Sequence, residues 1–193
     1  MIAADTRLSE GYSILTRRVS RSKVLSPKCV IATGGCHTDV LTLHKVLATA
    51  TERYALTHGS TMATPALAQL LSTTLYGRRF MPYYAFNVVA GLDAAGRGAV
   101  FTYDAVGSYE RVAYAAQGSG QKLIIPLLDN IVGGKNRRDR TPPVALTEAE
   151  AVALAIEAFV TAGEREMMVG DAVEIFVINA AGTRRQLFEL KRD

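Results

Sequence analysis

The chain has 193 residues, 49% of them apolar and 21% charged, which is typical of a folded globular protein and excludes general disorder. Its net charge of +4 comes from 22 basic residues scattered among 18 acidic ones, so the sequence predicts no nucleic-acid-binding stripe. No apolar run approaches the roughly 20 residues that cross a bilayer, and no segment resembles a signal peptide. We therefore expect one intracellular domain over residues 1–193, without membrane contact, and with Cys29 and Cys36 as free thiols.

The first half of the chain predicts strands followed by two helices. Strand-like segments occur at "MIAAD", "YSILTR" and "KCVIAT", the first leaving through a turn at "TRLSEG". Apolar residues then recur at helical spacing up to Gly59, at Val40, Leu43, Leu47 and Tyr54. A second helix is predicted over "ALAQLLSTTLY", with Thr64 as its cap, Pro65 in its first turn and Gly77 at its end.

The second half predicts a sheet, two helical stretches and a closing hairpin. Alternation returns in "YAFNVVAGL", "AVFTYDA" and "YERVAYAAQ", which indicates an antiparallel meander. "GQKLIIPLLDNIVGG" predicts a helix that Pro126 either kinks or divides. A basic loop at 135–140 precedes the turn at 142–143, and Thr147 with Glu150 forms a capping box for the last helix. "AVEIFVIN" and "TRRQLFEL" complete an α+β fold with paired helices outside a sandwich of two antiparallel sheets.

Several residues outside these patterns could carry chemistry, but each has a simpler interpretation. His37, His44 and His58 lack a suitably spaced additional metal ligand, so we expect surface or interface histidines. Cys36 and His37 are adjacent on a helix and point about 100° apart, which disfavours a nucleophile and base pair. The "TGGC" and "GSG" segments could present amides to an anion, but tight turns between strand and helix explain them more simply.

Long segments of the chain resemble the beta family of the proteasome core particle. They include "AADTRLSEGYSI", "ATGGCHTDVLTLHKVL", "LSTTLYGRRFMPYYAFNVVAGLD", "GAVFTYDAVGSYER", "PLLDN" and "AGERE…VGDAVEIFVI". The resemblance extends from Ala3 nearly to the end and is greatest to a class of non-catalytic subunits. It implies the N-terminal nucleophile hydrolase fold, a four-layer sandwich of two antiparallel sheets between helix pairs, with the first strand apparently missing.

The resemblance also identifies the positions at which active members carry catalytic groups. These positions are Asp5, Arg21, Gly35, Ser119, Glu166 and Val169. Arg21 stands where active members have a lysine, although an alignment with Lys23 or Lys28 is also possible. Arginine stays protonated and is bulkier, and a valine cannot replace the hydrogen-bonding serine expected at position 169.

The resemblance implies that active members have an additional strand, headed by a nucleophilic threonine, before the segment that matches "MIAAD". We therefore expect no catalytic residue in this chain, and a structural role in ring assembly and in shaping the degradation chamber. The alternative is an active threonine-type endopeptidase subunit whose first strand is lost from the sequence. An independent binding module is a third possibility and predicts a stable monomer.

The segment 78–111 contains more aromatic residues than one sheet face can bury, which favours an interface. We expect Tyr83, Tyr84 and Tyr109 to contact other subunits. By resemblance, Asp104, Val106 and Ser108 line the substrate pocket of an adjacent catalytic beta subunit, although Ala105 replaces the usual proline.

The expected partners are the other alpha and beta subunits of stacked heptameric rings. The resemblance implies that these rings degrade ubiquitin-tagged proteins in the cytoplasm and nucleus of eukaryotes. We expect no cofactor, no metal and no nucleic acid.

Overall fold

The computed structural model describes residues 1–136, 138 and 145–192. Within these residues the N-terminal half holds five strands and two helices: β1 (Ile2–Asp5), β2 (Leu8–Glu10), β3 (Ser13–Thr16), β4 (Ser22–Ser26), β5 (Cys29–Gly35), α1 (His37–His58) and α2 (Thr64–Tyr76). The C-terminal half holds β6 (Ala85–Leu92), β7 (Gly98–Tyr103), β8 (Tyr109–Val112), α3 (Gln121–Ile131), α4 (Glu148–Gly163), β9 (Ala172–Asn179) and β10 (Gly182–Glu189). The predicted turn at 142–143 and residues 137, 139 and 140 of the basic loop at 135–140 lie outside the described residues.

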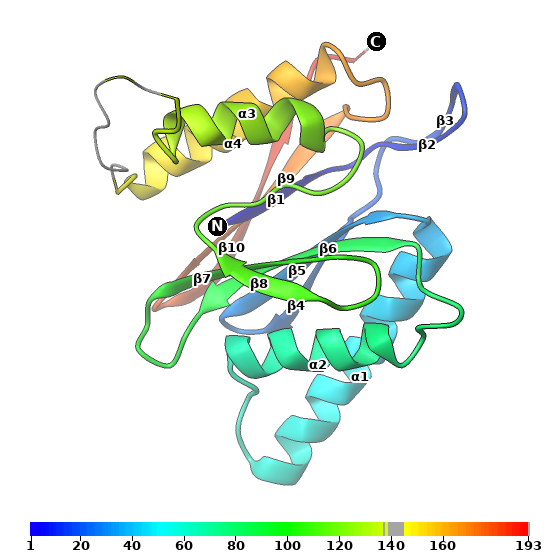
Figure 1. Cartoon of the computed structure of the whole chain (residues 1–193), viewed down its shortest axis with the longest axis vertical. Coiled ribbons are helices and arrows are strands. Elements are labelled where there is room, and N and C mark those ends of the chain that lie inside the picture. The colour runs from blue at the N-terminus through cyan, green and yellow to red at the C-terminus, as the bar shows by residue number, and fades with distance from the viewer. Residues whose placement is uncertain (137, 139–144, 193) are drawn as a thin grey trace.

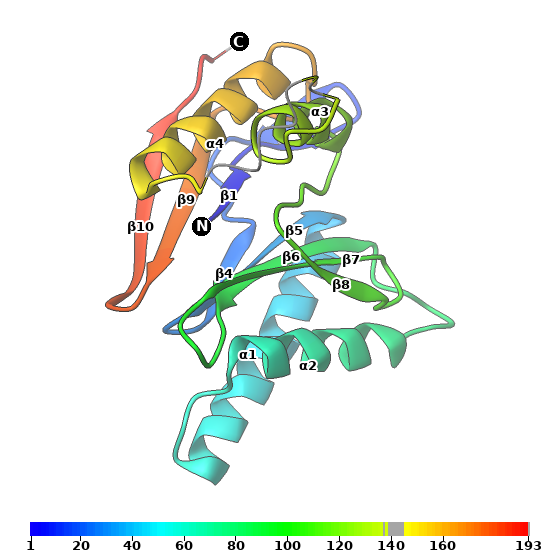
Figure 2. The same ribbon diagram turned by 60° about the vertical axis from the view of Figure 1, so that its left-hand side comes forward.

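The elements form four layers. A five-stranded antiparallel sheet has the order β4-β5-β6-β7-β8, and a three-stranded antiparallel sheet has the order β1-β9-β10. The two sheets pack face to face, with α1 and α2 outside the larger sheet and α3 and α4 outside the smaller one (Figures 1 and 2). The predicted α+β architecture is therefore confirmed.

Apolar residues fill the spaces between these layers. Alternate residues of β5 face opposite sides, so that Ile31 packs under the helices and Val30 packs between the sheets. On the other side of the sandwich, Val173, Ile175 and Val177 of β9 pack beneath α4. Both sheets are thus covered on both faces. This packing holds the end of β1, where the candidate site lies, in a defined position.

The helix ends follow the predicted signals with one exception. Gly59 ends α1 with a φ of 64°, and Thr147 and Glu150 form the complete capping box of α4. Pro126 lies inside α3, which continues to Ile131. Thr64 is not the cap of α2, because its hydroxyl donates a hydrogen bond to the Leu92 carbonyl at 2.7 Å, and Ala63 takes the cap position instead.

Two strand predictions need correction. The segment "TRLSEG" is not only a turn, because Leu8–Glu10 pairs with Ser13–Thr16 in a two-stranded hairpin that projects from the sandwich (Figure 1). The third strand of the predicted meander ends at Val112, well before Gln117, whose side-chain amide donates to Thr102 and to the Tyr103 carbonyl. None of the helices in the described part of the chain combines the length and apolar character needed to cross a bilayer.

Candidate functional site

The positions that resemble a catalytic set meet at one end of the sheet sandwich, around Asp5 at the end of β1. Arg21 places its Nε 3.3 Å from Oδ1 of Asp5, and it donates from Nη2 to the carbonyl of Arg7. Arg21, rather than Lys23 or Lys28, therefore makes the ion pair with Asp5. Burial raises the pKa of Asp5 to about 6, although the positive charge of Arg21 opposes this shift.

Two glycine turns, one at the end of β5 and one before α3, lie against each other. Gly35 has a φ of 118°, and a Cβ there would lie 2.3 Å from the Tyr84 carbonyl oxygen, so only glycine fits. Gly34 lies against Gly118, since a Cβ on Gly34 would lie 3.4 Å from the Gly118 Cα. Ser119 is exposed within the second turn. The "TGGC" and "GSG" segments therefore form the tight turns that were predicted.

The loop after α4 closes the site on its remaining side. Val169 is 6% exposed and packs against Gly120, and the Gly170 amide donates to Oδ2 of Asp5 at 3.4 Å. Glu166 turns away, with Oε2 lying 3.7 Å from Nζ of Lys122 on α3. Glu166 consequently contributes no charge to the Asp5 and Arg21 pair.

These contacts limit the chemistry of the site. Arg21 stays protonated, and its guanidinium is engaged by Asp5 and by the backbone, so it cannot accept a proton. Val169 offers no polar group. Ser119 is exposed, and none of the side-chain contacts in the described residues pairs it with a base. None of these six positions, as the structure describes them, provides an activated nucleophile.

A buried charge cluster that the sequence reasoning missed holds the loop after α4. Arg7 donates from Nε to Oδ2 of Asp171 at 3.0 Å and from Nη1 to the Met167 carbonyl at 2.9 Å. Arg17 also binds Asp171, which adopts a φ of 69°. Burial alone would raise the pKa of Asp171, but hydrogen bonds from Arg7 and Arg17 outweigh it and lower the pKa. No local pattern marks this cluster, because Arg7 and Asp171 lie 164 residues apart.

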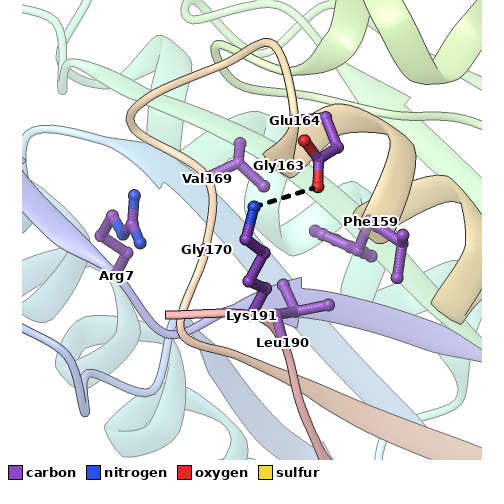
Figure 3. A pocket seen from close by; sticks show the side chains of 9 residues that line it. Arg7, Phe159, Gly163, Glu164, Val169, Gly170, Leu190 and Lys191 are labelled. Atoms are coloured by element: carbon purple, nitrogen blue, oxygen red, sulfur yellow. Dashed lines mark ion pairs between the residues drawn. The ribbon is translucent and has the colours of Figure 1, made fainter. Parts of the chain in front are cut away.

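A small cavity lies behind this loop, between α4 and the end of β10 (Figure 3). Its volume is about 170 Å³, and Arg7, Val169 and Gly170 form the wall nearest the site. Glu164 and Lys191 face one another across it, with Oε1 and Nζ 3.9 Å apart. Ligand sites usually measure roughly 300–1,000 Å³, so this cavity is too small for a typical small-molecule ligand.

His44 corrects the expectation of surface or interface histidines, because it is buried at 7% exposure. Thr33 donates its hydroxyl proton to Asn87, so Nε2 of His44 must donate to the Thr33 oxygen, at 2.8 Å. Burial, together with a smaller effect of the charge of Lys23, lowers the pKa of His44 to about 4. His44 is therefore a neutral part of the core, and the residues with described positions include no cluster able to hold a metal ion.

Both cysteines are free thiols, as predicted. Cys29 is buried, which raises its pKa to about 12, so it stays a neutral thiol. Cys36 is exposed, and a hydrogen bond with the Thr38 hydroxyl is the main cause that lowers its pKa. The partner of this thiol is thus Thr38, and no contact joins it to the His37 ring in the described structure.

The proposed interface tyrosines differ in exposure. Tyr84 is 63% exposed and Tyr109 is partly buried against the core, with its hydroxyl donating to Gln69. Tyr83 is only 7% exposed and packs into the core beneath α2 together with Phe101 and Tyr103. The sheet and helices therefore bury more of the aromatic residues than the sequence predicted, and Tyr83 has little surface left for a partner.

The loop "DAVGS" is a rigid turn despite the absence of proline. Oδ1 of Asp104 accepts hydrogen bonds from the amides of Val106 at 3.0 Å and Ser108 at 2.9 Å. Ser72 of α2 donates to the Gly107 carbonyl at 2.6 Å and anchors the turn to the helix. These bonds give the turn the rigidity that Ala105 cannot supply.

Comparisons with known proteins agree with the resemblance. The family model described as "Proteasome subunit" matches residues 1–178. A "Proteasome subunit beta type-1" of Oryza sativa subsp. japonica is 51% identical over all of this chain and 89% of its own length. Proteins of the same description from Arabidopsis thaliana and Drosophila melanogaster are 49% and 41% identical over all of this chain, which covers 88% and 83% of their lengths.

Proposed function

This chain belongs to the proteasome subunit family, and from that premise we propose that it is a non-catalytic beta subunit of the eukaryotic proteasome core particle. In this role the chain occupies a fixed position in a beta ring and helps to enclose the chamber in which ubiquitin-tagged proteins are degraded. Its residues 1–193 form one domain of the N-terminal nucleophile hydrolase fold. Its partners are the alpha and beta subunits of stacked heptameric rings in the cytoplasm and nucleus.

The observation that carries the proposal is the ion pair of Asp5 and Arg21. A lysine at position 21 could lower the pKa of an adjacent amine and exchange a proton with it, whereas a guanidinium stays charged. Here the guanidinium is also bound to Asp5 and to the Arg7 carbonyl, so it acts as a structural strut. Val169 supports the same conclusion, because it fills the position of a hydrogen-bonding serine with an apolar side chain.

A second candidate function is supported by what the site retains. Asp5, Gly35 and the "GSG" turn keep the arrangement expected around a threonine nucleophile. An active threonine-type endopeptidase subunit is therefore the alternative. It requires a strand headed by a threonine ahead of this sequence, and it requires that Arg21 replace lysine without loss of activity.

The turn at 104–108 gives this subunit a proposed effect on catalysis elsewhere. We infer that Asp104, Val106 and Ser108 line the substrate pocket of the adjacent catalytic beta subunit. Their fixed geometry supports this role, because a rigid turn can shape a neighbouring pocket without first losing conformational entropy. Exposed Tyr84 and partly exposed Tyr109 are proposed to contact neighbouring subunits.

The proposal is tested by native mass spectrometry of particles that contain the affinity-tagged chain, combined with a covalent probe for N-terminal threonine. We expect the chain in a complex of many different subunits, with the probe attached only to other chains. Probe on this chain would establish the alternative, and a lone unlabelled monomer would refute both functions.

A further inference from the structure

The connection between α2 and β6 exposes a group of aromatic and basic side chains that neither the sheet nor the helices cover. Figures 1 and 2 show this connection projecting from the side of the sandwich. Its exposed members, which we call the aromatic–arginine surface, are Tyr76, Arg78, Arg79, Phe80, Met81 and Tyr84. Phe80 is 98% exposed, Met81 80%, Tyr76 65% and Tyr84 63%. Such a concentration of large exposed apolar side chains is unfavourable for a free protein and indicates a partner.

The exposure does not come from an unstructured loop. Successive turn hydrogen bonds run from the Arg79 amide to the Tyr76 carbonyl and from the Met81 amide to the Arg78 carbonyl, both at 3.0 Å. Tyr83 is buried immediately afterwards, and the Arg78 guanidinium lies over its ring, 5.3 Å from the centroid. Phe80 and Met81 are therefore held outward between two fixed points.

The start of α1 fixes the other end of this connection. The Tyr84 amide donates to Oδ2 of Asp39 at 2.8 Å, and the Tyr84 carbonyl accepts from the Cys36 amide at 2.8 Å. The Tyr84 ring packs edge-on against Phe86, with centroids 5.2 Å apart. A surface ordered in this way loses little conformational entropy when it binds.

Composition and charge define the partner that would fit. Tyrosine, phenylalanine, methionine and arginine are the residue types enriched at protein interfaces, and seven of the nine residues in "YGRRFMPYY" belong to them. The segment carries two arginines and no acidic residue, and the nearby Asp39 carboxylate is already engaged by the Tyr84 amide. A second copy of this chain would bring like charges together across a symmetric contact, which disfavours self-association.

We propose that the aromatic–arginine surface docks into a different subunit of the particle, in an apolar recess bordered by carboxylates. Phe80 and Met81 fill the recess, and Arg79 pairs with the acidic rim. This inference rests on the proposed function, because it assigns one contact of the assembled ring to a defined set of side chains. Of the expected interface residues Tyr83, Tyr84 and Tyr109, this surface includes only Tyr84.

The test compares incorporation of tagged full-length chains into core particles in cells that also make the untagged chain. Phe80→Ser combined with Met81→Ser should lower the incorporated fraction about tenfold or more, as expected for loss of central apolar anchors. The matched control is Leu56→Ser, which removes an isolated leucine, 88% exposed, near the end of α1. Arg79→Glu should also lower incorporation, whereas Arg53→Glu on α1 should not.

Thermal unfolding of the purified chains shows whether the variants fold, and native mass spectrometry gives the incorporated fraction. Normal incorporation of the double variant, or equal loss in the Leu56→Ser control, would overturn this inference while leaving the proposed function intact. A wild-type chain that never enters a particle would overturn both this inference and the proposed function. Self-association of purified wild-type chain that the double variant abolishes would refute a different subunit as the partner.

Discussion

Arg7 is a buried cation whose role depends on a single carboxylate at the other end of the chain. Its side chain is 4% exposed and that of Asp171 is 3% exposed, so removal of the guanidinium leaves a buried charge with only Arg17 to balance it. We expect Arg7→Met to lower the free energy of unfolding by about 3–5 kcal/mol in urea denaturation of the full chain. Arg97→Met removes a 75%-exposed partner of Asp93 and should cost less than about 1 kcal/mol. Equal costs for the two variants would contradict this role for Arg7.

Asp5 makes stability depend on pH in a direction that its raised pKa determines. The folded chain binds the proton with a pKa of about 6, against 3.8 in the unfolded chain. Protonated Asp5 therefore contributes stability that is fully present below pH 3.8 and is lost as the pH rises through about 6. Each unit of pKa difference between the folded and unfolded chains corresponds to roughly 1.4 kcal/mol, so the free energy of unfolding falls by about 3 kcal/mol.

The measurement for Asp5 is the free energy of unfolding of the wild-type chain and of Asp5→Asn from about pH 3.5 to pH 7.5. The wild-type chain should lose about 3 kcal/mol relative to the variant over this range, because asparagine does not titrate. Parallel curves for the two chains would show that burial does not perturb this carboxyl group.

At the scale of the elements, the turn between β5 and α1 depends on Gly35. Alanine there would require a φ of 118° and would place Cβ 2.3 Å from a backbone oxygen of Tyr84. We expect Gly35→Ala to lower the free energy of unfolding by about 3 kcal/mol or more, because the backbone strain at this φ adds to the steric overlap of Cβ with the Tyr84 oxygen. Gly98→Ala in β7 is the control, since nothing lies within 4 Å of its Cβ, and it should leave stability unchanged or raise it by up to about 1 kcal/mol. The same urea titration measures both variants, and a Gly35→Ala chain as stable as the control would contradict the overlap.

The elements that the sequence predicts well are those with local signals. The length of α1 follows from its apolar spacing and from Gly59, and the start of α4 follows from Thr147 and Glu150. The start of α2 was predicted one residue late, because Thr64 binds the Leu92 carbonyl, a contact that depends on the tertiary structure. The same limit applies to the site: glycine turns and Asp5 were recognisable, whereas the cluster of Arg7 and Asp171 has no local pattern.

At the scale of the whole molecule, the turn at 104–108 is where we propose that this chain affects the activity of a neighbouring subunit. Asp104→Ala removes the acceptor of two amide hydrogen bonds, whereas Asp104→Asn keeps an oxygen in the same place. In purified core particles, we expect the alanine variant to raise the KM of one peptidase activity roughly threefold to tenfold, and the asparagine variant to change it less. Fluorogenic peptides for each activity measure this effect. An equal change in every activity, or none, would contradict a pocket-lining role.

The pairing of β1 with β9 also has a consequence for how the chain folds during synthesis. Ile2 lies opposite Phe176, so β1 pairs with a strand that the ribosome makes much later. At about 5–20 residues per second, β1 stays without its partner for several seconds to tens of seconds, with an unpaired strand edge. The larger sheet with α1 and α2 is complete much earlier and can fold while the chain is still being made. During this interval the nascent chain exposes the unpaired, aggregation-prone edge of β1 beside the folded larger sheet. A chaperone that covers this edge would protect the chain.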